Sequence, residues 1–316
     1  VPLMRQGVRF RWTYRFGEGA GKRARGLAGA GLGSLMAQQL SIVAVVFLAS
    51  NRGGVGTLPL YHYAQAVYLL PYAVLVVPLA TAAFPHLAAA SERRTVLQAV
   101  SASTVRLVVA TSLAGAAALV AAAPAVEALF GAVDRSGGAA GLGSAVAWFA
   151  PGLVGFGLMT VLMRVLYAAD HPRVAVAGAA LGWLMVAVAS VVLTLCLTRN
   201  GPNVAATLTA LAAASAIGMT VGGLALAAGV KRALGPETLA GLGRTLLVLG
   251  IGAAVGGAAG WLVAVQFAHS GAWVALIGGL AGPLVALGAI GLATLGDASL
   301  KPAIAQLRSH GLEEAP

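Results

Sequence analysis

Among the polar side chains that interrupt the apolar stretches of this chain are Gln38, Gln39, Ser41, Gln65 and Arg164. A polar group in hydrocarbon is costly, so such residues usually face the inside of a helix bundle or a cavity. Their chemistry would be the noncovalent binding of a polar ligand within a membrane. Two alternatives stay open: hydrogen bonds between helices for the neighbouring glutamines, and snorkelling of Arg164 to the membrane interface.

Motifs for covalent chemistry are incomplete. The segment Gly17–Arg23 lacks the first glycine and the Ser/Thr of a phosphate-binding loop. The histidines do not pair at metal-ligand spacing, and no serine lies in a nucleophile elbow. We therefore predict that the chain is not an enzyme and holds no metal or cofactor.

The carboxylates all fall outside the predicted cores of the apolar stretches, in a loop, an interface or a terminus. This placement argues against a carboxylate proton relay or a carboxylate-rich cation site. Three tyrosines near the end of the second stretch are predicted to form an outer aromatic belt: Tyr61, Tyr63 and Tyr68.

The composition indicates which elements position these residues. Of the 316 residues, 59% are hydrophobic and only 9% are charged, and the mean hydropathy is +0.90. Soluble domains carry about 25% charged residues. The chain is therefore predicted to be an all-α, polytopic transmembrane helix bundle.

About eight apolar runs approach the roughly 20 residues that cross a bilayer. The second carries Pro71, Pro78 and Pro85, which predict a kinked helix facing protein or a cavity. Just before the third, an amphipathic helical lead-in is predicted to lie at the membrane surface. The predicted spans are Leu27–Ala49, Leu58–Leu87, Leu107–Ala123, Val146–Ala169, Val174–Leu197, Val204–Val230, Leu246–Phe267 and Trp273–Leu295.

Glycines recur at intervals of four in two of these spans. They predict close helix packing within the bundle, with dimerisation as the alternative. The residues are Gly218 and Gly222 in the sixth span, and Gly252, Gly256 and Gly260 in the seventh.

The basic residues predict the orientation. With eight spans and both ends cytoplasmic, all of the 20 Lys and Arg residues except Arg52, Arg135 and Arg199 fall in inner segments. This is the positive-inside pattern. The basic and aromatic segment 9–16 is predicted to anchor at an anionic leaflet rather than to bind nucleic acid.

Three elements carry a resemblance to a known family. The first runs through Leu48-Ala49-Ser50, Gly56-Thr57-Leu58, Tyr63-Ala64, Leu70-Pro71, Ala80-Thr81 and Phe84-Pro85. The others are Leu129-Phe130-Gly131 and Met163-Arg164-Val165-Leu166-Tyr167-Ala168 with Arg173. In order and spacing they resemble the MurJ/MviN flippases of the multidrug/oligosaccharidyl-lipid/polysaccharide exporter superfamily.

The resemblance implies a domain organisation. The eight spans would be the family's seventh to fourteenth helices, forming one lobe of a two-lobed transporter plus two appended helices. The expected parts are a basic cytoplasmic or interfacial segment 1–26, a six-helix C-terminal lobe 27–230, two additional helices 231–296 and a cytoplasmic tail 297–316. The N-terminal lobe is expected to be absent from this chain.

The resemblance also implies a function, namely flipping of the peptidoglycan precursor lipid II across the cytoplasmic membrane by alternating access. Expected partners are that lipid-linked precursor, membrane lipids and the missing N-terminal lobe. Gln38, Gln39, Ser41, Gln65 and Arg164 would then bind substrate.

The chain departs from the family at one position. Gln65 and Ala66 stand where many members carry Asp-Arg, and actinobacterial members share such changes. The alternatives are a polysaccharide-lipid or multidrug exporter of the same superfamily, or a membrane scaffold for wall synthesis.

Overall fold

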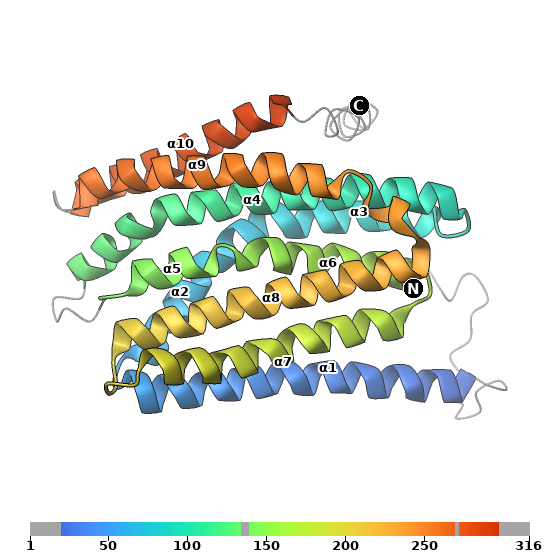
Figure 1. Cartoon of the computed structure of the whole chain (residues 1–316), viewed down its shortest axis with the longest axis horizontal. Helices are drawn as coiled ribbons and strands as arrows, with labels where there is room; N and C mark the ends of the chain where they lie inside the picture. The colour runs from blue at the N-terminus through green and yellow to red at the C-terminus, as the bar shows by residue number, and fades with distance from the viewer. Residues whose placement is uncertain (1–19, 134–138, 269–271, 297–316) are drawn as a thin grey trace, which may run out of the picture.

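The structure, a computed structural model, describes residues 20–133, 139–268 and 272–296 (Figure 1). Throughout these ranges the chain forms helices joined by short connections, and they contain no strand. The predicted segment 1–26 falls mostly outside the described residues, since only residues 20–26 belong to the first helix. The predicted tail 297–316 lies wholly outside them.

The helices run nearly parallel or antiparallel to one another, and successive connections lie at opposite ends of the bundle (Figure 1). Short π-helical or 3-10 segments, labelled η, continue or join several of them. The elements are α1 (Ala20–Leu48), η2 (Ala49–Gly53), α2 (Thr57–Pro71), η3 (Tyr72–Val76), α3 (Val77–Ala89), α4 (Arg94–Val133), α5 (Leu142–Phe149), α6 (Gly152–Ala168), α7 (Pro172–Leu197), α8 (Val204–Leu234), η4 (Pro236–Leu239), α9 (Leu242–Ala268) and α10 (Ala272–Gly296).

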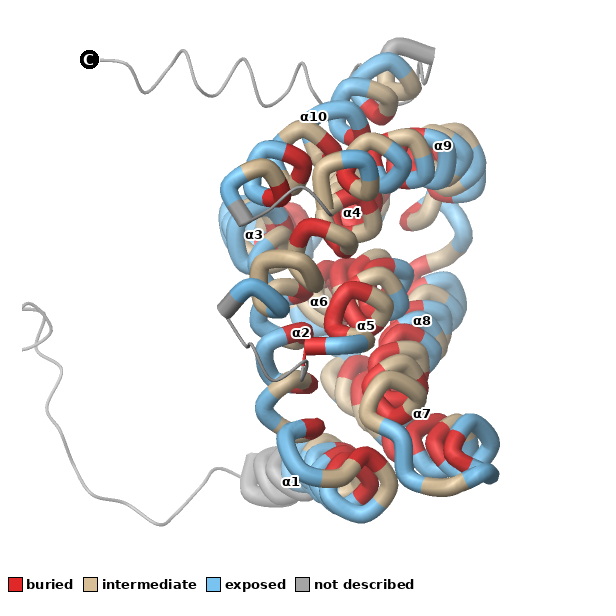
Figure 2. The backbone as a smooth tube through the Cα atoms, turned by 90° about the vertical axis from the view of Figure 1, so that its left-hand side faces the viewer, coloured by how far each residue is buried: buried red, intermediate tan, exposed pale blue. Residues whose placement is uncertain are grey.

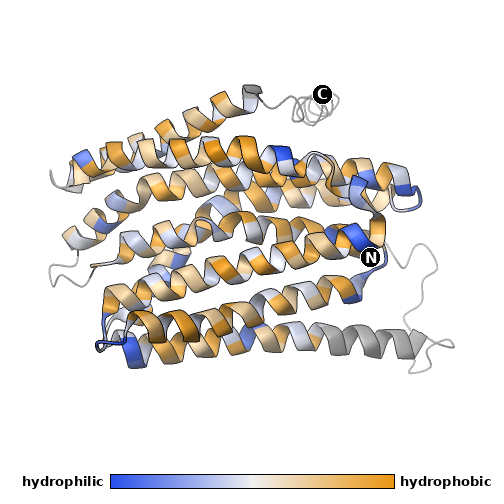
Figure 3. Cartoon of the chain, viewed as in Figure 1, coloured by the Kyte–Doolittle hydropathy of each residue, from blue (hydrophilic) through white to orange (hydrophobic). Residues whose placement is uncertain are grey.

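Seven of the described helices are long and apolar enough to cross a membrane, and the bent pair α5–α6 makes an eighth. Apolar residues dominate the middle of the helices, while hydrophilic residues gather at the two ends (Figure 3). The prediction of an all-α bundle with about eight spans is therefore confirmed.

The second span bends through a π turn. Its first half α2 ends at Pro71, the π-helical η3 follows, and Pro78 lies in the first turn of the second half, α3. Because each proline lacks a backbone donor, the regular hydrogen-bond pattern breaks between them. The predicted kink thus has a defined place.

The third and fourth spans differ from their predicted bounds. Helix α4 has 40 residues, about 60 Å at 1.5 Å per residue, because the helical lead-in continues into the third span without a break. Leu97 and Val105 of this lead-in are buried in the bundle. In the fourth span, the helix breaks around Pro151 with a bend of 41° between α5 and α6.

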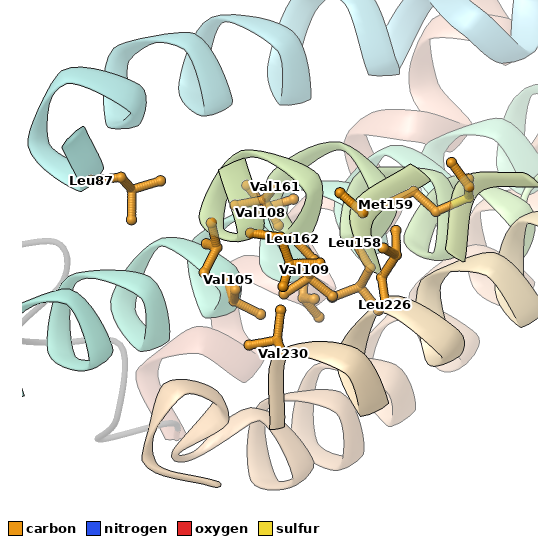
Figure 4. Close-up of a cluster of buried hydrophobic side chains, with 14 of the residues drawn as sticks. Leu87, Val105, Val108, Val109, Leu158, Met159, Val161, Leu162, Leu226 and Val230 are labelled. Carbon is orange, nitrogen blue, oxygen red and sulfur yellow. The ribbon is translucent and has the colours of Figure 1, made fainter. Parts of the chain in front are cut away.

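Branched and long aliphatic side chains from α3, α4, α6 and α8 form the larger core cluster (Figure 4). Leu87, Val105, Val161, Leu162 and Val230 meet there and are almost completely buried. A second cluster lies toward the other end, where aromatic residues of α2 and α5 pack with leucines of α8. Together the clusters fix α6 and α8 as the centre of the bundle.

The glycine pattern packs helices of this one chain. A Cβ at Gly218 would meet Val186 of α7, and one at Gly222 would lie 3.0 Å from Gly182 Cα. On α9, a Cβ at Gly256 would lie 2.8 Å from Ala289 Cβ of α10. The prediction of close packing within the bundle is confirmed at these positions.

Helix α4 joins the last two helices to the rest. Seen end-on, α9 and α10 cover one side of α4, while α1 and α7 lie at the far edge (Figure 2). The N-terminal half of α4 also donates to the α8–α9 connection, from Arg94 Nη2 to Ala233 O (3.5 Å), Gln98 Nε2 to Leu234 O (2.5 Å) and Arg106 Nη1 to Ala240 O (3.0 Å). These donors satisfy carbonyls at and beyond the C-terminus of α8, where positive charge is also favoured.

Candidate functional site: a polar groove between α1 and α2

A groove of about 290 Å³ opens between α1 and α2, with α6, α7 and α8 contributing further walls. Aliphatic and aromatic side chains form much of its surface, among them Val45, Phe156 and Trp183. Its polar lining residues are Gln38, Ser41, Tyr61, His62, Gln65, Tyr68 and Ser215. Three of the five sequence-predicted binding residues, Gln38, Ser41 and Gln65, therefore lie in one groove.

On α1, Gln38 and Ser41 share a face because residues three apart on a helix are neighbours. The Ser41 hydroxyl donates to Gln38 O at 2.7 Å and is buried, with 2% of the residue exposed. The side-chain amide of Gln38 is half-buried and has no partner among the described residues. It is therefore available to a ligand in the groove.

On α2, the groove face is built from His62, Gln65 and Leu69, spaced three and four residues apart. Tyr61 and Tyr68 flank this face and pack on Phe149 of α5, with ring centroids 5.6 and 5.0 Å apart. The buried Tyr68 hydroxyl has no hydrogen-bond partner among the described residues.

This packing corrects the predicted aromatic belt. Tyr61 and Tyr68 are each only 4% exposed, whereas Tyr63 is 50% exposed. The rings of Tyr61 and Tyr68 pack on Phe149 in the second core cluster. Because Phe149 is distant in sequence, the spacing of the tyrosines could not reveal this contact.

The other two predicted binding residues lie elsewhere. Gln39 is exposed and does not line the groove. Arg164 is half-buried on α6, and its Nη1 donates to Thr160 O of the same helix at 3.4 Å. That these two residues bind substrate stays a prediction.

Arg164 nevertheless shares a stripe of α6 with a groove residue. Phe156 lines the groove, and Thr160 and Arg164 follow at successive intervals of four. Tyr72 of η3 covers this stripe, since its ring stacks on Phe156 at 4.3 Å and its hydroxyl lies 2.9 Å from Thr160 Oγ1. The backbone of Arg164 lies about 12 Å from that of Phe156 along the helix axis, and Arg164 does not line the groove.

The groove lining contains no Asp, Glu, Lys or Arg among the described residues. Sequence reasoning did not select His62 or Ser215 as binding residues. The interval of three between His62 and Gln65 was the available signal for the histidine, whereas Ser215 offered none.

A second cavity, of about 360 Å³, lies between the end of α4, the start of α5 and α9. Its carboxylate, Glu127, accepts hydrogen bonds from the backbone N–H groups of Gly141 and Gly143, both at 3.1 Å. The Ser144 hydroxyl lies 2.9 Å from Thr209 Oγ1. These polar groups already form hydrogen bonds with one another. We therefore interpret this region as a structural contact between α4 and α5 rather than as a binding site.

Comparison with known proteins gives two findings. The family described as "Lipid II flippase MurJ" matches residues 1–282. The fold is similar to a solved structure, "Lipid II flippase MurJ, inward closed conformation", with a TM-score of 0.59 and 16% sequence identity over 82% of this chain. This chain spans about half of that structure, covering 51% of it. No curated protein matches the chain.

Proposed function

Since the chain belongs to the lipid II flippase MurJ family, we propose that it forms one lobe of a transporter that moves lipid II from the inner to the outer leaflet. A second, N-terminal lobe would complete the path. The two lobes would expose the substrate site to each side of the membrane in turn.

The groove between α1 and α2 carries this proposal. A lipid-linked headgroup must avoid hydrocarbon while its tail stays in lipid, so its path needs polar groups inside an apolar bundle. Gln38, Ser41 and Gln65 supply amide and hydroxyl groups that suit a glycan or peptide. The absence of carboxylates from the described lining suits an anionic diphosphate, which they would repel.

Export of cationic drugs is less well supported by the same observation. A cationic ligand inside a membrane usually pairs with a carboxylate, and the described groove lining offers none. A polysaccharide-lipid would meet the same chemistry as lipid II, so the substrate assay must compare the two.

We further propose that both ends of this chain are cytoplasmic. The α3–α4, α6–α7 and α8–α9 connections lie together at one end of the bundle (Figure 1). Near them lie Arg93, Arg173, Lys231, Arg232 and Arg244, whereas Arg52 and Arg199 lie near connections at the other end. The positive-inside rule then assigns the first end to the cytoplasm. Residues 27–230 would form the lobe and 231–296 the appended pair.

The central test uses the full-length protein in liposomes that contain lipid II. We expect Gln38→Leu to lower the flipping rate about tenfold, because a lost hydrogen bond to a polar headgroup is worth about 1.4 kcal/mol. Gln266→Leu is the matched control, since Gln266 is exposed on α9 and lies outside the groove. Flipping is read from the accessibility of lipid II in the outer leaflet.

Two results would contradict the proposal. One is an unaltered protein that leaves lipid II on its original side while transporting a polysaccharide-lipid. The other is an equal loss of flipping rate in Gln38→Leu and Gln266→Leu, which would show that lipid II does not pass through the groove.

A further inference from the structure

Two neighbouring spans break at the same level of the bundle. In the second span η3 separates α2 from α3, and in the fourth span Ala150 and Pro151 separate α5 from α6. A Cβ added to Gly115 of α4 would lie 2.7 Å from Pro71 Cβ and 2.8 Å from Leu153 Cδ2. Both breaks therefore lie against the same point of α4, which is itself helical through this level.

The two halves of the second span contact different partners. Helix α2 packs on α5, where the ring of Tyr68 stacks on Phe149, whereas α3 packs on α6. Tyr72, the first residue of η3, stacks on Phe156 of α6, and its hydroxyl lies 2.9 Å from Thr160 Oγ1 of the same helix. The boundary between the two sets of contacts therefore falls at the end of α2.

The second half of the span is held more firmly than the first. Helix α6, on which α3 packs, lies close against α8, since a Cβ at Gly152 would be 2.7 Å from Ala216 Cα. On α3, Ala80 and Leu87 are completely buried. Helix α2 meets α5 through aromatic rings, and the buried Tyr68 hydroxyl has no hydrogen-bond partner in the described part of the chain. Apolar contacts lack the directionality of hydrogen bonds, so they allow α2 to tilt.

We propose that η3 is a hinge about which α2 tilts, and that this tilt opens and closes the groove between α1 and α2. The inference rests on the proposed function and names the moving wall of its groove. All α2 residues of the lining, from Tyr61 to Leu69, precede Pro71, so they move with α2. Pro71 and Pro78 lie on either side of the hinge, and each lacks the backbone donor that would help to hold the helix straight. A hinge needs only a few such residues to absorb the change in backbone angles.

Distances between spin labels on the full-length protein in liposomes measure the tilt. Pro59, near the start of α2, lies about 18 Å from Pro71 along the helix axis, so a tilt of about 15° would move it by about 5 Å. We expect the distance between labels at Pro59→Cys and at Leu224→Cys of α8, both exposed positions, to change by several ångströms when lipid II is added. The control pair is the exposed Ala82→Cys of α3 with Leu224→Cys, whose distance should stay constant because α3 lies beyond the hinge. Cys196 is replaced by serine in both pairs.

Alanine at the hinge prolines tests the origin of the tilt. Pro71→Ala keeps the Cβ that faces Gly115 and restores a backbone donor, and Pro78→Ala restores another. We expect the double variant to bind lipid II but to flip it about tenfold more slowly, because restored backbone hydrogen bonds would have to break in each tilt. Pro85→Ala is the matched control, since Pro85 is exposed on α3 and lies outside the hinge. Retained binding of lipid II shows that the double variant is folded.

The outcomes separate this inference from the proposed function. Flipping of lipid II by the labelled protein with both distances constant, or with equal changes at Pro59 and Ala82, would overturn the hinge and leave the flippase proposal standing. A change at Pro59 alone, without flipping, would support the hinge and contradict the flippase proposal. Constant distances in a protein that neither binds nor flips lipid II would overturn both. Equal flipping rates in the double variant and in Pro85→Ala would also overturn the hinge, because the two prolines would then have no part in the motion.

Discussion

At the residue scale, Glu127 shows how one side chain can position an element. It lies within α4, where sequence analysis expected a loop or an interface, because the helix extends to Val133. Its two carboxylate oxygens accept from two backbone N–H groups at the start of α5. A helix N-terminus leaves such donors unsatisfied and carries partial positive charge, so a carboxylate there is doubly favoured.

Removing this carboxylate should loosen the α4–α5 joint. We expect Glu127→Ala to lower the free energy of unfolding by about 1–3 kcal/mol, because it leaves two N–H groups without their acceptor. Glu127→Gln keeps one acceptor oxygen and should cost less. Thermal unfolding of the purified protein in detergent measures both, with the exposed Glu92→Ala as control. Equal stability of Glu127→Ala and Glu92→Ala would contradict this account.

At the element scale, close helix contacts depend on residues that lack a side chain. A Cβ at Gly260 of α9 would strike Gly282 O of α10 and lie 2.7 Å from Ala121 Cβ of α4. Gly250, on the same helix, has no atom within 4 Å of its added Cβ. Substituting each glycine by alanine therefore distinguishes the effect of helix packing, at Gly260, from the effect of intrinsic helix propensity, at Gly250.

We expect Gly260→Ala to lower the unfolding temperature, since α9 must move away from both neighbours. Gly250→Ala should leave it unchanged or raise it, because alanine favours a helix by up to about 1 kcal/mol over glycine. Thermal unfolding in detergent again provides the measurement. A Gly260 variant as stable as the Gly250 variant would show that this three-helix contact is looser than described.

The elements also show what the sequence could and could not predict. Hydropathy identified each candidate span that the described residues contain, because lipid demands an apolar run of a certain length. It predicted a helical lead-in before the third span, but not that this lead-in and the span form one unbroken helix, α4, with one face of the lead-in buried by neighbours distant in sequence. For the groove, the rarity of glutamine in apolar runs selected Gln38 and Gln65. The rotation of α1 about its own axis decides that Gln38 faces the groove and Gln39 does not. That rotation depends on how α1 packs against α7, which the sequence does not show.

At the scale of the whole molecule, the proposed orientation is directly testable. The exposed Cys196 is first replaced by serine, and single cysteines are introduced at Asn200 and at Glu237, both exposed at opposite ends of α8. A membrane-impermeant maleimide added to intact cells should label Asn200→Cys alone, because the basic end is expected to face the cytoplasm. Labelling of Glu237→Cys alone would invert the topology.

The length of α4 bears on how the two parts of the chain stay together. Its residues Ala117, Ala121 and Ala125 form a narrow strip that meets Gly257 and Gly260 of α9 and Gly279 and Gly282 of α10. Lipid tails pack less well against this surface of alanines and glycines than the backbones of the neighbouring helices do. We therefore expect α9 and α10 to remain packed on α4 even when the connection at 235–241 is cleaved. Helix α4 would then transmit any tilt of α6 and α8 directly to α9 and α10, whether or not the connection between α8 and α9 is intact.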